Sequence, residues 1–422
     1  MNRALTGLLT FMFILMSAGF SLPLTARAAE MAQPLPESLR PIGEWEEVRR
    51  LVMVFHTDLP HSAEGVRGLG AIRNAYLDLI KEALPFVNVT VIAPSSVDAL
   101  DFAKWVHREG LGESLRNGRL IMETFGVDTI WIRDYSALLA RGASTGALYG
   151  IDLLYTQHAA DQLRYYDDRM VYWLYRNRSV RWVRPPLLLD GGNFDTDGRG
   201  LCFTSTEALG HNRTGQKNLA EKFHYWLGCR ETIFLEPIPA ESTGHLDMFF
   251  KVLTPDTWVL GQYAARERSE EPLDHLESLA QKAMEKNAAV LSSVIKKRGR
   301  GTLIRMGMPR PHTFDHYDWN PSEWDLPRKQ RQSGKHPLGS PLARETYYKT
   351  QVGFKTFVNS IYLRGARGEI VVVPSYDTSE NDEASVAIYR KIYPHAEIIR
   401  MPSDYLIQDE GASHCVLYGM PE

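Results

Sequence analysis

The feature that most constrains the fold of this chain is an alternation of strand-like and helix-like segments. Short apolar runs are followed by stretches with apolar residues at helical spacing, and a further apolar run then returns. At least four such strand–helix–strand units are visible, each of about 50 residues or more. The expected strands include residues 51–55, 87–92, 120–125, 201–203, 232–235, 370–374 and 397–399. The alternation predicts an α/β fold rather than an all-α or all-β one.

Helices are expected between these strands, and two regions do not follow the alternation of strands and helices. The expected helices cover residues 71–83 and 97–107, a segment that ends at Gly228, and a segment that begins at Ser379 and ends by Pro394. Residues 155–184 are polar and aromatic with few clear strands, and residues 308–348 are rich in Pro, His, Trp and charge. Within the latter, an insertion at 313–348 is expected to form either a lid over a site or a partly disordered surface loop.

The first 28 residues read as a secretory signal peptide. Arg3 precedes an apolar stretch at 8–16, and Ala26-Arg27-Ala28 is a small-x-small cleavage site. A single membrane anchor over residues 4–24 is the less favoured alternative. We therefore expect residues 29–422 to form one catalytic domain that is periplasmic or secreted, with no stable membrane anchor after signal cleavage.

Composition excludes some partners and leaves one question about the cysteines. The net charge is −3 on 422 residues, with basic residues spread throughout, so nothing indicates a nucleic acid or an acidic membrane surface as partner. Three cysteines are an odd number for an exported protein, which draws attention to a reactive thiol. One possibility is that Cys202 and Cys229 form a disulfide and leave Cys415 free.

Cys415 and three polar clusters far upstream are the candidates for chemistry. The clusters are Trp-Ile-Arg-Asp at 131–134, Asp-Gly-Gly-Asn at 190–193 and Gly-His-Leu-Asp at 244–247. Each lies beside an apolar strand-like run, so each is expected at a strand end that could converge on one pocket. A thiol, an imidazole and two or three carboxylates suit nucleophilic attack on a cationic carbon that the carboxylates hold. A guanidinium is the cation that fits this description.

Each cluster also has a simpler explanation. If residues 245–247 are extended, His245 and Asp247 share one face, but an exposed pair at a strand end is common. Trp131 and Asp134 need a turn to share one site, and the alternative is an Arg133–Asp134 surface pair. The combination carries more weight than any one cluster.

Two further polar residues are second-tier candidates. Asp190 stands before a Gly-Gly step that suits close backbone approach, although turn chemistry explains it nearly as well. Asn359 is a polar residue inside the apolar run 357–362, where a buried amide needs partners and a substrate could supply one.

The order of these motifs, together with Met-Pro-Arg-Pro at 308–311 and a C-terminal His-Cys, resembles the Porphyromonas-type peptidylarginine deiminase and agmatine deiminase family. The resemblance covers roughly residues 41–421. It implies the pentein fold, an α/β propeller of about five pseudo-repeated ββαβ units around a central site.

The resemblance also implies roles. Cys415 would be the nucleophile, His245 the general acid/base, and Asp134 and Asp247 the carboxylates that bind the guanidinium, with Trp131 packed on its plane. Three more positions would bind substrate: Asn359, Asp190 and Asn193. The chain departs from the family at 135–137, where Tyr-Ser-Ala replaces a Gly-Pro step, and in its long insertion, and both departures bear on the identity of the substrate.

The expected reaction is hydrolysis of an arginine-like guanidinium to a ureido group and ammonia through a thiouronium on Cys415. Peptidyl-arginine is the favoured substrate because export separates the protein from cytoplasmic agmatine. Agmatine deimination to N-carbamoylputrescine, amidinotransferase chemistry and a catalytically silent binding protein for guanidino compounds remain alternatives. No metal or organic cofactor is expected. A metal site in the insertion, at His312, Asp315, His316 and Asp318, is disfavoured because surface residues of a polar loop need no ligand. His414 is a poor candidate for activating the thiol, because adjacent strand residues face opposite sides.

Overall fold

Five small sheets with the same strand arrangement make up most of the β-structure in the described part of the chain. The computed structural model describes residues 35–46, 48–56, 65–157, 164–177, 180–264, 272–314, 351–376 and 382–421. The predicted signal peptide at 1–28 and all of the insertion except residues 313 and 314 lie outside these residues, as do three residues of the disfavoured metal site.

In each sheet the first strand runs antiparallel to the second, and the second runs parallel to the third. In that order the strands are β5 (Leu138–Gly142), β6 (Leu148–Ile151) and β7 (Arg181–Val183); β8 (Asp195–Thr196), β9 (Leu201–Ser205) and β10 (Glu231–Leu235); β11 (Phe250–Thr254), β12 (Thr257–Gln262) and β13 (Thr302–Gly307); β16 (Ile361–Gly365), β17 (Gly368–Ser375) and β18 (Ala396–Pro402); and β19 (Leu417–Met420), β2 (Arg50–Val54) and β3 (Asn88–Ala93).

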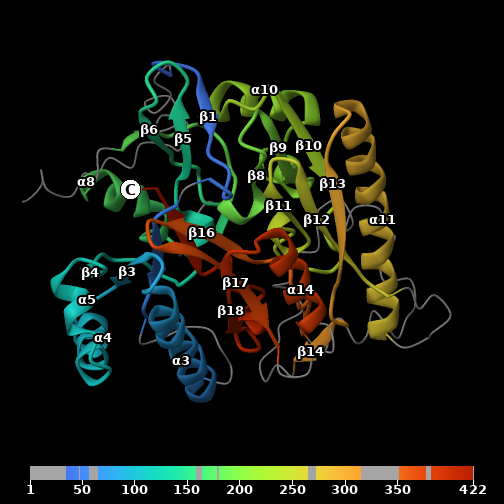
Figure 1. Ribbon diagram of the computed structural model, residues 1–422. Coiled ribbons are helices and arrows are strands. Elements are labelled where there is room, and N and C mark those ends of the chain that lie inside the picture. The colour runs from blue at the N-terminus through green and yellow to red at the C-terminus, as the bar shows by residue number, and fades with distance from the viewer. Residues whose placement is uncertain are drawn as a thin grey trace, which may run out of the picture.

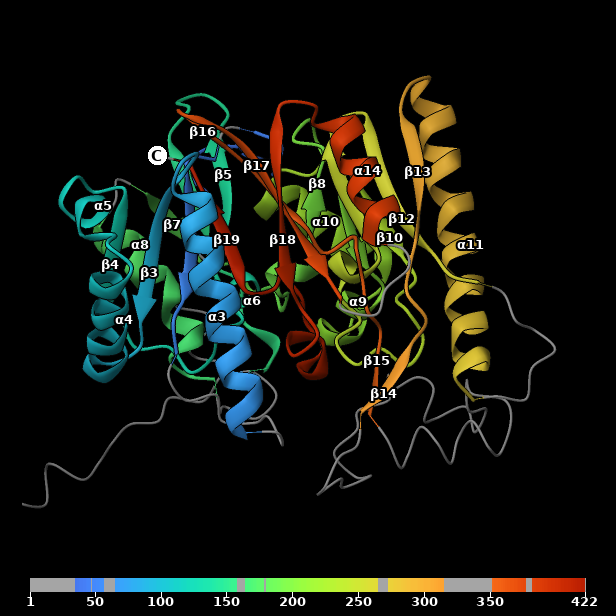
Figure 2. The ribbon, with the colours of Figure 1, turned by 60° about the horizontal axis from the view of Figure 1, so that its bottom comes forward.

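A helical crossover connects the second strand to the third in every one of these sheets, because parallel neighbours cannot be joined by a tight turn. The connecting helices are α8 (Met170–Asn177), preceded by η1 (Asp167–Arg169); α9 (Glu207–His211) with α10 (Gln216–Leu227); α11 (Pro272–Arg298); α14 (Asp382–Ile392); and α3 (Gly65–Ala83). Figures 1 and 2 show α3 and α11 well apart, with β18 and α14 between them. The order strand–strand–helix–strand thus recurs five times, and the predicted α/β fold is confirmed.

The remaining elements extend or border these sheets. The strand β1 (Leu39–Pro41) pairs with β5, and β4 (Leu120–Thr124) pairs with β3 after α4 (Ser96–Arg108) and α5 (Gly112–Arg116). A two-stranded sheet of β14 (His312–Phe314) and β15 (Gln351–Gly353) follows β13, and η4 (Leu406–Asp409) precedes the last strand. Within the described residues, no helix combines the length and the apolar character needed to cross a bilayer.

A short turn precedes the first strand of each of the five sheets, and every predicted site residue lies in one of these turns or, as Trp131, Asp190 and His245 do, directly before one. They are α6 (Ile132–Tyr135), η2 (Gly191–Asn193), η3 (Leu246–Met248), the irregular segment 354–360, and the turn at 413–416. The β19–β2 pairing joins the C-terminal end of the described chain to its N-terminal part and so completes the fifth sheet. The fold therefore presents one polar turn from each repeat.

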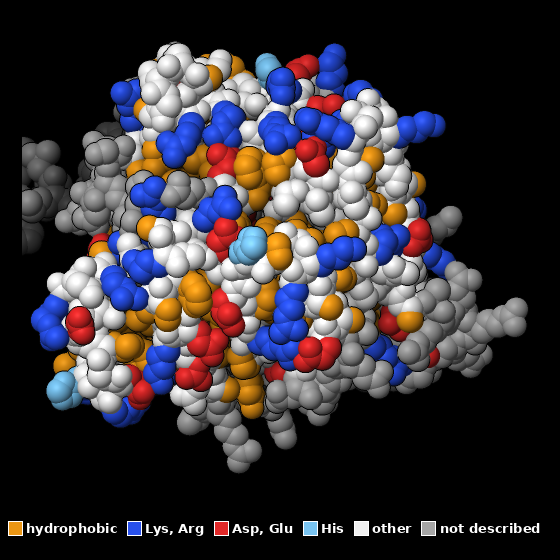
Figure 3. Space-filling model, in the orientation of Figure 1, with side chains coloured by type: hydrophobic (Ala, Val, Ile, Leu, Met, Phe, Trp, Pro, Cys, Tyr) orange, Lys and Arg blue, Asp and Glu red, His pale blue; other side chains and the backbone are white. Residues whose placement is uncertain are grey.

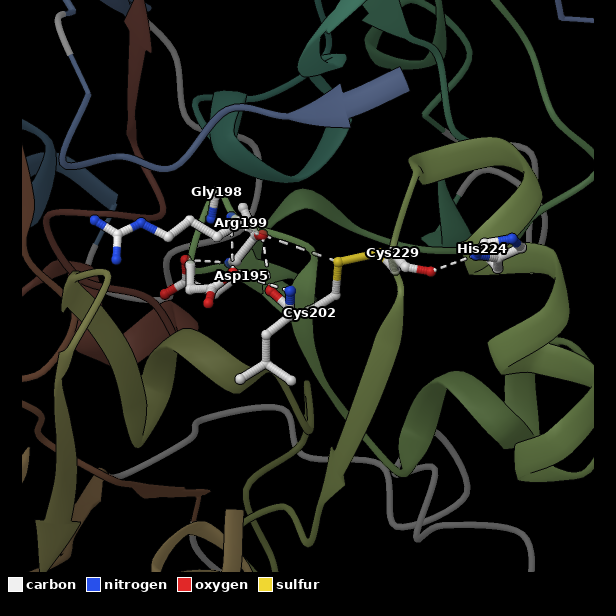
Figure 4. The surroundings of a disulfide bond; sticks show 9 residues. Asp195, Gly198, Arg199, Cys202, His224 and Cys229 are labelled. Atoms are coloured by element: carbon white, nitrogen blue, oxygen red, sulfur yellow. Dashed lines mark hydrogen bonds between the residues drawn. A yellow bond between two sulfur atoms is a disulfide. The ribbon is translucent and has the colours of Figure 1, made fainter. Parts of the chain in front are cut away.

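A disulfide joins Cys202 on β9 to Cys229, which follows α10, and it leaves Cys415 as the free cysteine. Figure 4 shows this bond between a strand and the end of the crossover helix that follows it, with the His224 ring hydrogen-bonded to the Cys229 carbonyl. The pairing that the sequence left open is therefore present. It closes a sequence separation of 27 residues.

We expect the double variant Cys202→Ser/Cys229→Ser to melt several degrees below the wild type, because a loop of this length is worth roughly 3 kcal/mol when cross-linked. Differential scanning calorimetry with and without dithiothreitol measures the effect. The reductant should lower the melting temperature of the wild type and leave that of the double variant unchanged. Equal melting temperatures for both proteins under oxidising conditions would contradict the prediction.

Candidate active site

Two glycines allow three of the polar clusters to meet at one point. Gly191 and Gly192 open η2, and a Cβ added at Gly192 would lie 2.7 Å from Asp134 Oδ1 and 2.9 Å from His245 Nδ1. The same atom would lie 3.1 Å from Asp247 Oδ2. The Gly192 N–H also donates to Asp134 Oδ1 at 3.0 Å. Only glycine fits at 192, because any side chain there would occupy the space among the three functional groups.

The imidazole of His245 lies between two carboxylates. Its Nε2 is 3.0 Å from Asp190 Oδ2, and its Nδ1 is 3.5 Å from Asp134 Oδ1. Burial alone would lower the pKa of His245, but the carboxylates of Asp134, Asp190 and Asp247 outweigh burial and raise the pKa to about 10. At neutral pH the ring is therefore an imidazolium that can donate a proton.

Asp190 fixes the orientation of that ring. Its Oδ2 accepts a hydrogen bond from the Thr156 hydroxyl at 2.5 Å, and its Oδ1 accepts one from the Thr156 N–H at 2.9 Å. Burial would raise the pKa of Asp190, but the hydrogen bonds and charge of its partners, His245 first, lower it. Asp190 therefore remains a carboxylate beside the imidazolium.

The thiol of Cys415 is buried beside an amide and a carboxylate. Asn359 Nδ2 donates to Cys415 Sγ at 3.2 Å, and Asp247 Oδ2 lies 3.8 Å from the sulfur. Burial, followed by the Asp247 and Asp134 carboxylates, raises the pKa of Cys415 well above its usual value. The free protein therefore holds a neutral thiol, and a cation bound between these carboxylates would favour the thiolate.

The two oxygens of Asp247 have different surroundings. Oδ2 lies 2.6 Å from His414 Nδ1, whereas the buried Oδ1 has no hydrogen-bond partner within the described part of the chain. Burial would raise the pKa of Asp247, but the hydrogen bond and charge of His414 overcome burial and lower it. Asp247 therefore presents one unsatisfied, charged oxygen, which a native structure rarely leaves without a ligand.

The site around His245 holds more carboxylates than cations. Asp134, Asp190 and Asp247 face His245 as their shared cation. Burial raises the pKa of Asp134 against the opposing charge of His245, the other two carboxylates add to the rise, and the pKa reaches about 7. A raised carboxyl pKa beside a raised histidine pKa means that a further cation would be bound favourably here.

Asp134 reaches the site on the helical turn that the spacing required, and the contact of Trp131 with a substrate stays a prediction. Trp131 is the residue before α6, and a Cβ added at Gly411 would lie 2.2 Å from its ring. The alternative of an Arg133–Asp134 surface pair is wrong. Arg133 is buried and pairs with Glu44 at 2.7 Å.

Three local expectations differ from the structure or stay untested. Residues 245–247 are not extended, because His245 precedes η3 and the two side chains meet through a short helix. Asn359 lies in the irregular segment before β16 rather than in a strand. Asn193 Oδ1 accepts the Ser205 N–H at 2.9 Å and ties η2 to β9. Substrate binding by Asp190, Asn193 and Asn359 stays a prediction.

Sequence reasoning missed several residues around the site. Thr156, which holds Asp190, and Glu44, which pairs with Arg133, carry no motif. A signal existed for Lys251, because it is a charged residue inside the apolar run 248–253 and is buried in the structure. A buried lysine requires a partner, and Glu44 Oε2 lies 2.5 Å from its Nζ.

The chain is similar in sequence to proteins named as agmatine deiminases. Agmatine deiminase of Pseudomonas aeruginosa is 22% identical over 402 residues, which covers 92% of this chain and 97% of that protein. A Vibrio parahaemolyticus protein, named provisionally as an agmatine deiminase, is 24% identical, but the alignment spans 57% of this chain and 60% of that protein.

Solved structures show the same fold. An agmatine deiminase of C. jejuni with substrate bound matches with a TM-score of 0.66 at 19% identity, over 93% of this chain and 99% of that chain. The agmatine deiminase of Enterococcus faecalis matches with a TM-score of 0.66 at 16% identity, over 93% and 100% of the two chains. The fold is therefore the pentein fold that the resemblance implied.

The family model for Porphyromonas-type peptidyl-arginine deiminase matches residues 40–421, which contain all five repeats and every residue of the candidate site. With the order of motifs, the fivefold strand–strand–helix–strand frame and the buried Cys–His–carboxylate cluster, the chain belongs to the Porphyromonas-type peptidyl-arginine deiminase family.

Proposed function

We propose that this protein is a cysteine-dependent guanidine deiminase and that agmatine, or a similar small guanidine, is its substrate. The observation that carries the proposal is the buried Oδ1 of Asp247, which has no hydrogen-bond partner among the described residues and lies on the same side chain as an oxygen 3.8 Å from Cys415 Sγ. A guanidinium offers five donors in a planar fork that can satisfy such an oxygen and remains charged at all relevant pH values.

The first half of the reaction uses the groups already placed around that oxygen. Asp134 and Asp247 hold the guanidinium, and the bound cation favours ionisation of Cys415. The thiolate attacks the central carbon and forms a C–S bond. The C–N bond to one terminal nitrogen then breaks, and the His245 imidazolium supplies the proton with which ammonia leaves. The product of this half is an S-alkylthiouronium on Cys415.

The second half returns the enzyme to its starting state. The neutral His245, held by Asp190, removes a proton from a water molecule that attacks the thiouronium carbon. The C–S bond breaks, the thiolate leaves, and the protonated ureido compound loses a proton, which restores the neutral thiol of Cys415. Asn359 Nδ2 donates to the sulfur and so stabilises the thiolate in both halves.

Peptidyl-arginine is the second candidate substrate, and it is the one that the sequence favoured. It is supported by the description of the matching family model and by the export that we propose below. The named relatives support agmatine instead. Hydrolysis is favoured over amidino transfer for the same reason, because those relatives are named as deiminases.

The first prediction concerns the substrate and the nucleophile. We expect release of ammonia and a ureido product from at least one of agmatine, free arginine and Nα-acetylarginine amide, with agmatine the fastest. Cys415→Ser should lose this turnover by roughly a thousandfold or more, because removal of a nucleophile abolishes the covalent route. A colorimetric ureido assay with parallel ammonia detection measures both.

The outcomes separate the alternatives. Ammonia release only when an amine acceptor is added would identify an amidinotransferase. Binding of all three compounds without turnover would identify a silent binding protein. Faster turnover of Nα-acetylarginine amide than of agmatine would replace the first candidate with the second.

A second prediction concerns the pH dependence of the thiol. Because the Asp134 carboxylate helps to raise the pKa of Cys415, Asp134→Asn should lower that pKa and speed alkylation by iodoacetamide severalfold at pH 8 to 9, even though it weakens turnover. Since the pKa of Asp134 is about 7, its carboxyl is neutral in acid, and the acceleration should disappear well below pH 7.

Alkylation rates of the variant and the wild type between pH 5 and 10 test the direction of this change. The disulfide is left intact so that only Cys415 reacts. The matched control is Asp197→Asn, which changes a buried carboxylate that pairs with Arg298 at 3.0 Å. Asp197→Asn should leave the rate unchanged. Alkylation that is equally fast in Asp134→Asn and the wild type at pH 9 would show that Asp134 does not face the thiol.

We also propose that the protein is exported to the periplasm or beyond. The support is the signal-like N-terminus, together with a disulfide at Cys202–Cys229, which persists in oxidising compartments and is rare in the cytosol. On the face shown in Figure 3, basic and acidic side chains are interspersed.

Export predicts a shorter mature protein. When the full-length gene is expressed in a Gram-negative host, intact mass spectrometry of the periplasmic fraction should find a chain that begins at Ala29 and has lost two hydrogens at the disulfide. Substitution of Ala26 and Ala28 by bulky residues should block the cleavage. An uncleaved chain that remains in the cytosol with reduced cysteines would contradict export.

A further inference from the structure

A series of short ionic contacts connects Asp247, through His414, to Glu44 in the N-terminal part of the protein. His414 lies between two carboxylates, with Nδ1 2.6 Å from Asp247 Oδ2 and Nε2 2.7 Å from Glu44 Oε1. An imidazole donates from both nitrogens only as an imidazolium, so His414 can satisfy both carboxylates at once in that form. His414 is buried, and its ring faces away from solvent toward these two acids.

Glu44 is in turn held by cations from two other repeats. Arg133 Nη2, on α6, lies 2.7 Å from Glu44 Oε1, and Lys251 Nζ, on β11, lies 2.5 Å from Glu44 Oε2. Burial would raise the pKa of Glu44, but Arg133, His414 and Lys251 together lower it well below its usual value. Glu44, which is part-buried, therefore stays charged.

We propose that His414 and Glu44 are positioning residues that hold the Asp247 carboxylate in one rotation, with Oδ2 occupied and Oδ1 open to a guanidinium. This inference rests on the proposed function, because it explains how a substrate-binding carboxylate of that function is prepared. Among the described residues, the ring nitrogens of His414 contact Asp247 and Glu44 rather than the thiol of Cys415.

The physical need for such a pair follows from the burial of Asp247. A carboxylate without a fixed partner can rotate, can turn either oxygen toward Cys415, and can take up a proton to avoid the cost of a buried charge. The His414 contact prevents rotation of the Asp247 carboxylate and opposes its protonation. The Glu44 contact fixes the ring of His414, since each imidazole nitrogen then lies beside one carboxylate.

The alternative is that the same contacts only tie the turn at 413–416 to the rest of the fold. Other contacts already do this. The His414 N–H donates to Asn359 Oδ1 at 2.8 Å, and the Ser413 hydroxyl donates to the Asn359 carbonyl at 2.7 Å. Because the backbone is held independently, a change in the His414 side chain separates positioning from folding.

Binding to a catalytically dead protein tests the proposal. In the Cys415→Ser background, isothermal titration calorimetry with agmatine and with Nα-acetylarginine amide measures affinity without turnover. His414→Phe keeps the ring and removes both donors, and it should weaken the probe that binds by about ten- to a hundredfold, the range for a hydrogen bond to a charged group. His414→Asn, which keeps a donor at the Nδ1 position, should recover most of that loss.

Two further variants and a control complete the design. Glu44→Gln leaves an acceptor for His414 but removes the charge, and it should weaken binding severalfold in the same direction. In the double variant with Asp247→Asn, His414→Phe should add little, because both changes remove one function. His224→Phe is the matched control, since His224 is a part-buried histidine bonded to the Cys229 carbonyl, away from the pocket.

The titration of Asp247 gives a readout that does not depend on substrate. In ¹³C-aspartate NMR, assigned through Asp247→Asn, the pKa of Asp247 should rise in His414→Phe and change little in His224→Phe. The ionisable groups that face Asp247 are His414, His245, Lys251, Asp134 and Cys415.

The outcomes are distinguishable. If His414→Phe folds, binds as tightly as its parent and leaves the Asp247 titration unmoved, the positioning role is wrong. If the Cys415→Ser parent binds neither probe, the proposed function fails, and the Asp247 titration alone decides the positioning role. If His414→Phe does not fold, the same two measurements on Glu44→Gln and His414→Asn decide it.

Discussion

The structure depends on the burial of several carboxylates around one thiol. Asp134, Asp190 and Asp247 lie in the interior, where a charge without a partner is strongly disfavoured. The fold meets this constraint unevenly. Asp190 is satisfied by His245 and Thr156, whereas Asp247 has one oxygen bonded and one left open. Because the carboxylates around Cys415 outnumber the cations, the site favours binding of a further cation. The bound cation in turn favours the reactive thiolate.

The fivefold frame explains how residues so far apart reach this pocket. Each repeat begins with a turn that leads into its first strand, and the chemistry lies on those turns rather than on the strands. Strands and crossover helices form the apolar cores. Short helical turns can expose a carboxylate, an imidazole or a thiol at a defined angle without interrupting a ladder of backbone hydrogen bonds. Repetition therefore supplies five positions around one site, and the sequence at each position decides its role.

A second group of charged residues, centred on Glu44, lies behind Asp247. Glu44, from the segment after β1, receives cations from α6, from β11 and from the turn before β19. A part-buried carboxylate with three basic partners links the N-terminal segment to three of the repeats. Breaking such a cluster leaves unpaired charge in the interior, which costs more than the cluster contributes when whole. This explains why a residue that touches no substrate in the proposed reaction can matter for it.

The sequence by itself determined the α/β alternation, the candidate nucleophile Cys415 and the identity of the polar clusters, because these depend on local periodicity and on residue chemistry. It located the strands at 51–55, 87–92 and 370–374 closely, and it missed α11, whose helical pattern the alternation did not reveal. Only the tertiary structure decided that His245 and Asp247 meet through a short helix, that Asp190 holds the imidazole, that Cys202 pairs with Cys229, and that Glu44 and His414 stand behind Asp247. The physical reason is that these contacts join residues from different repeats, up to 370 positions apart, and no local pattern records which turns the fold brings together.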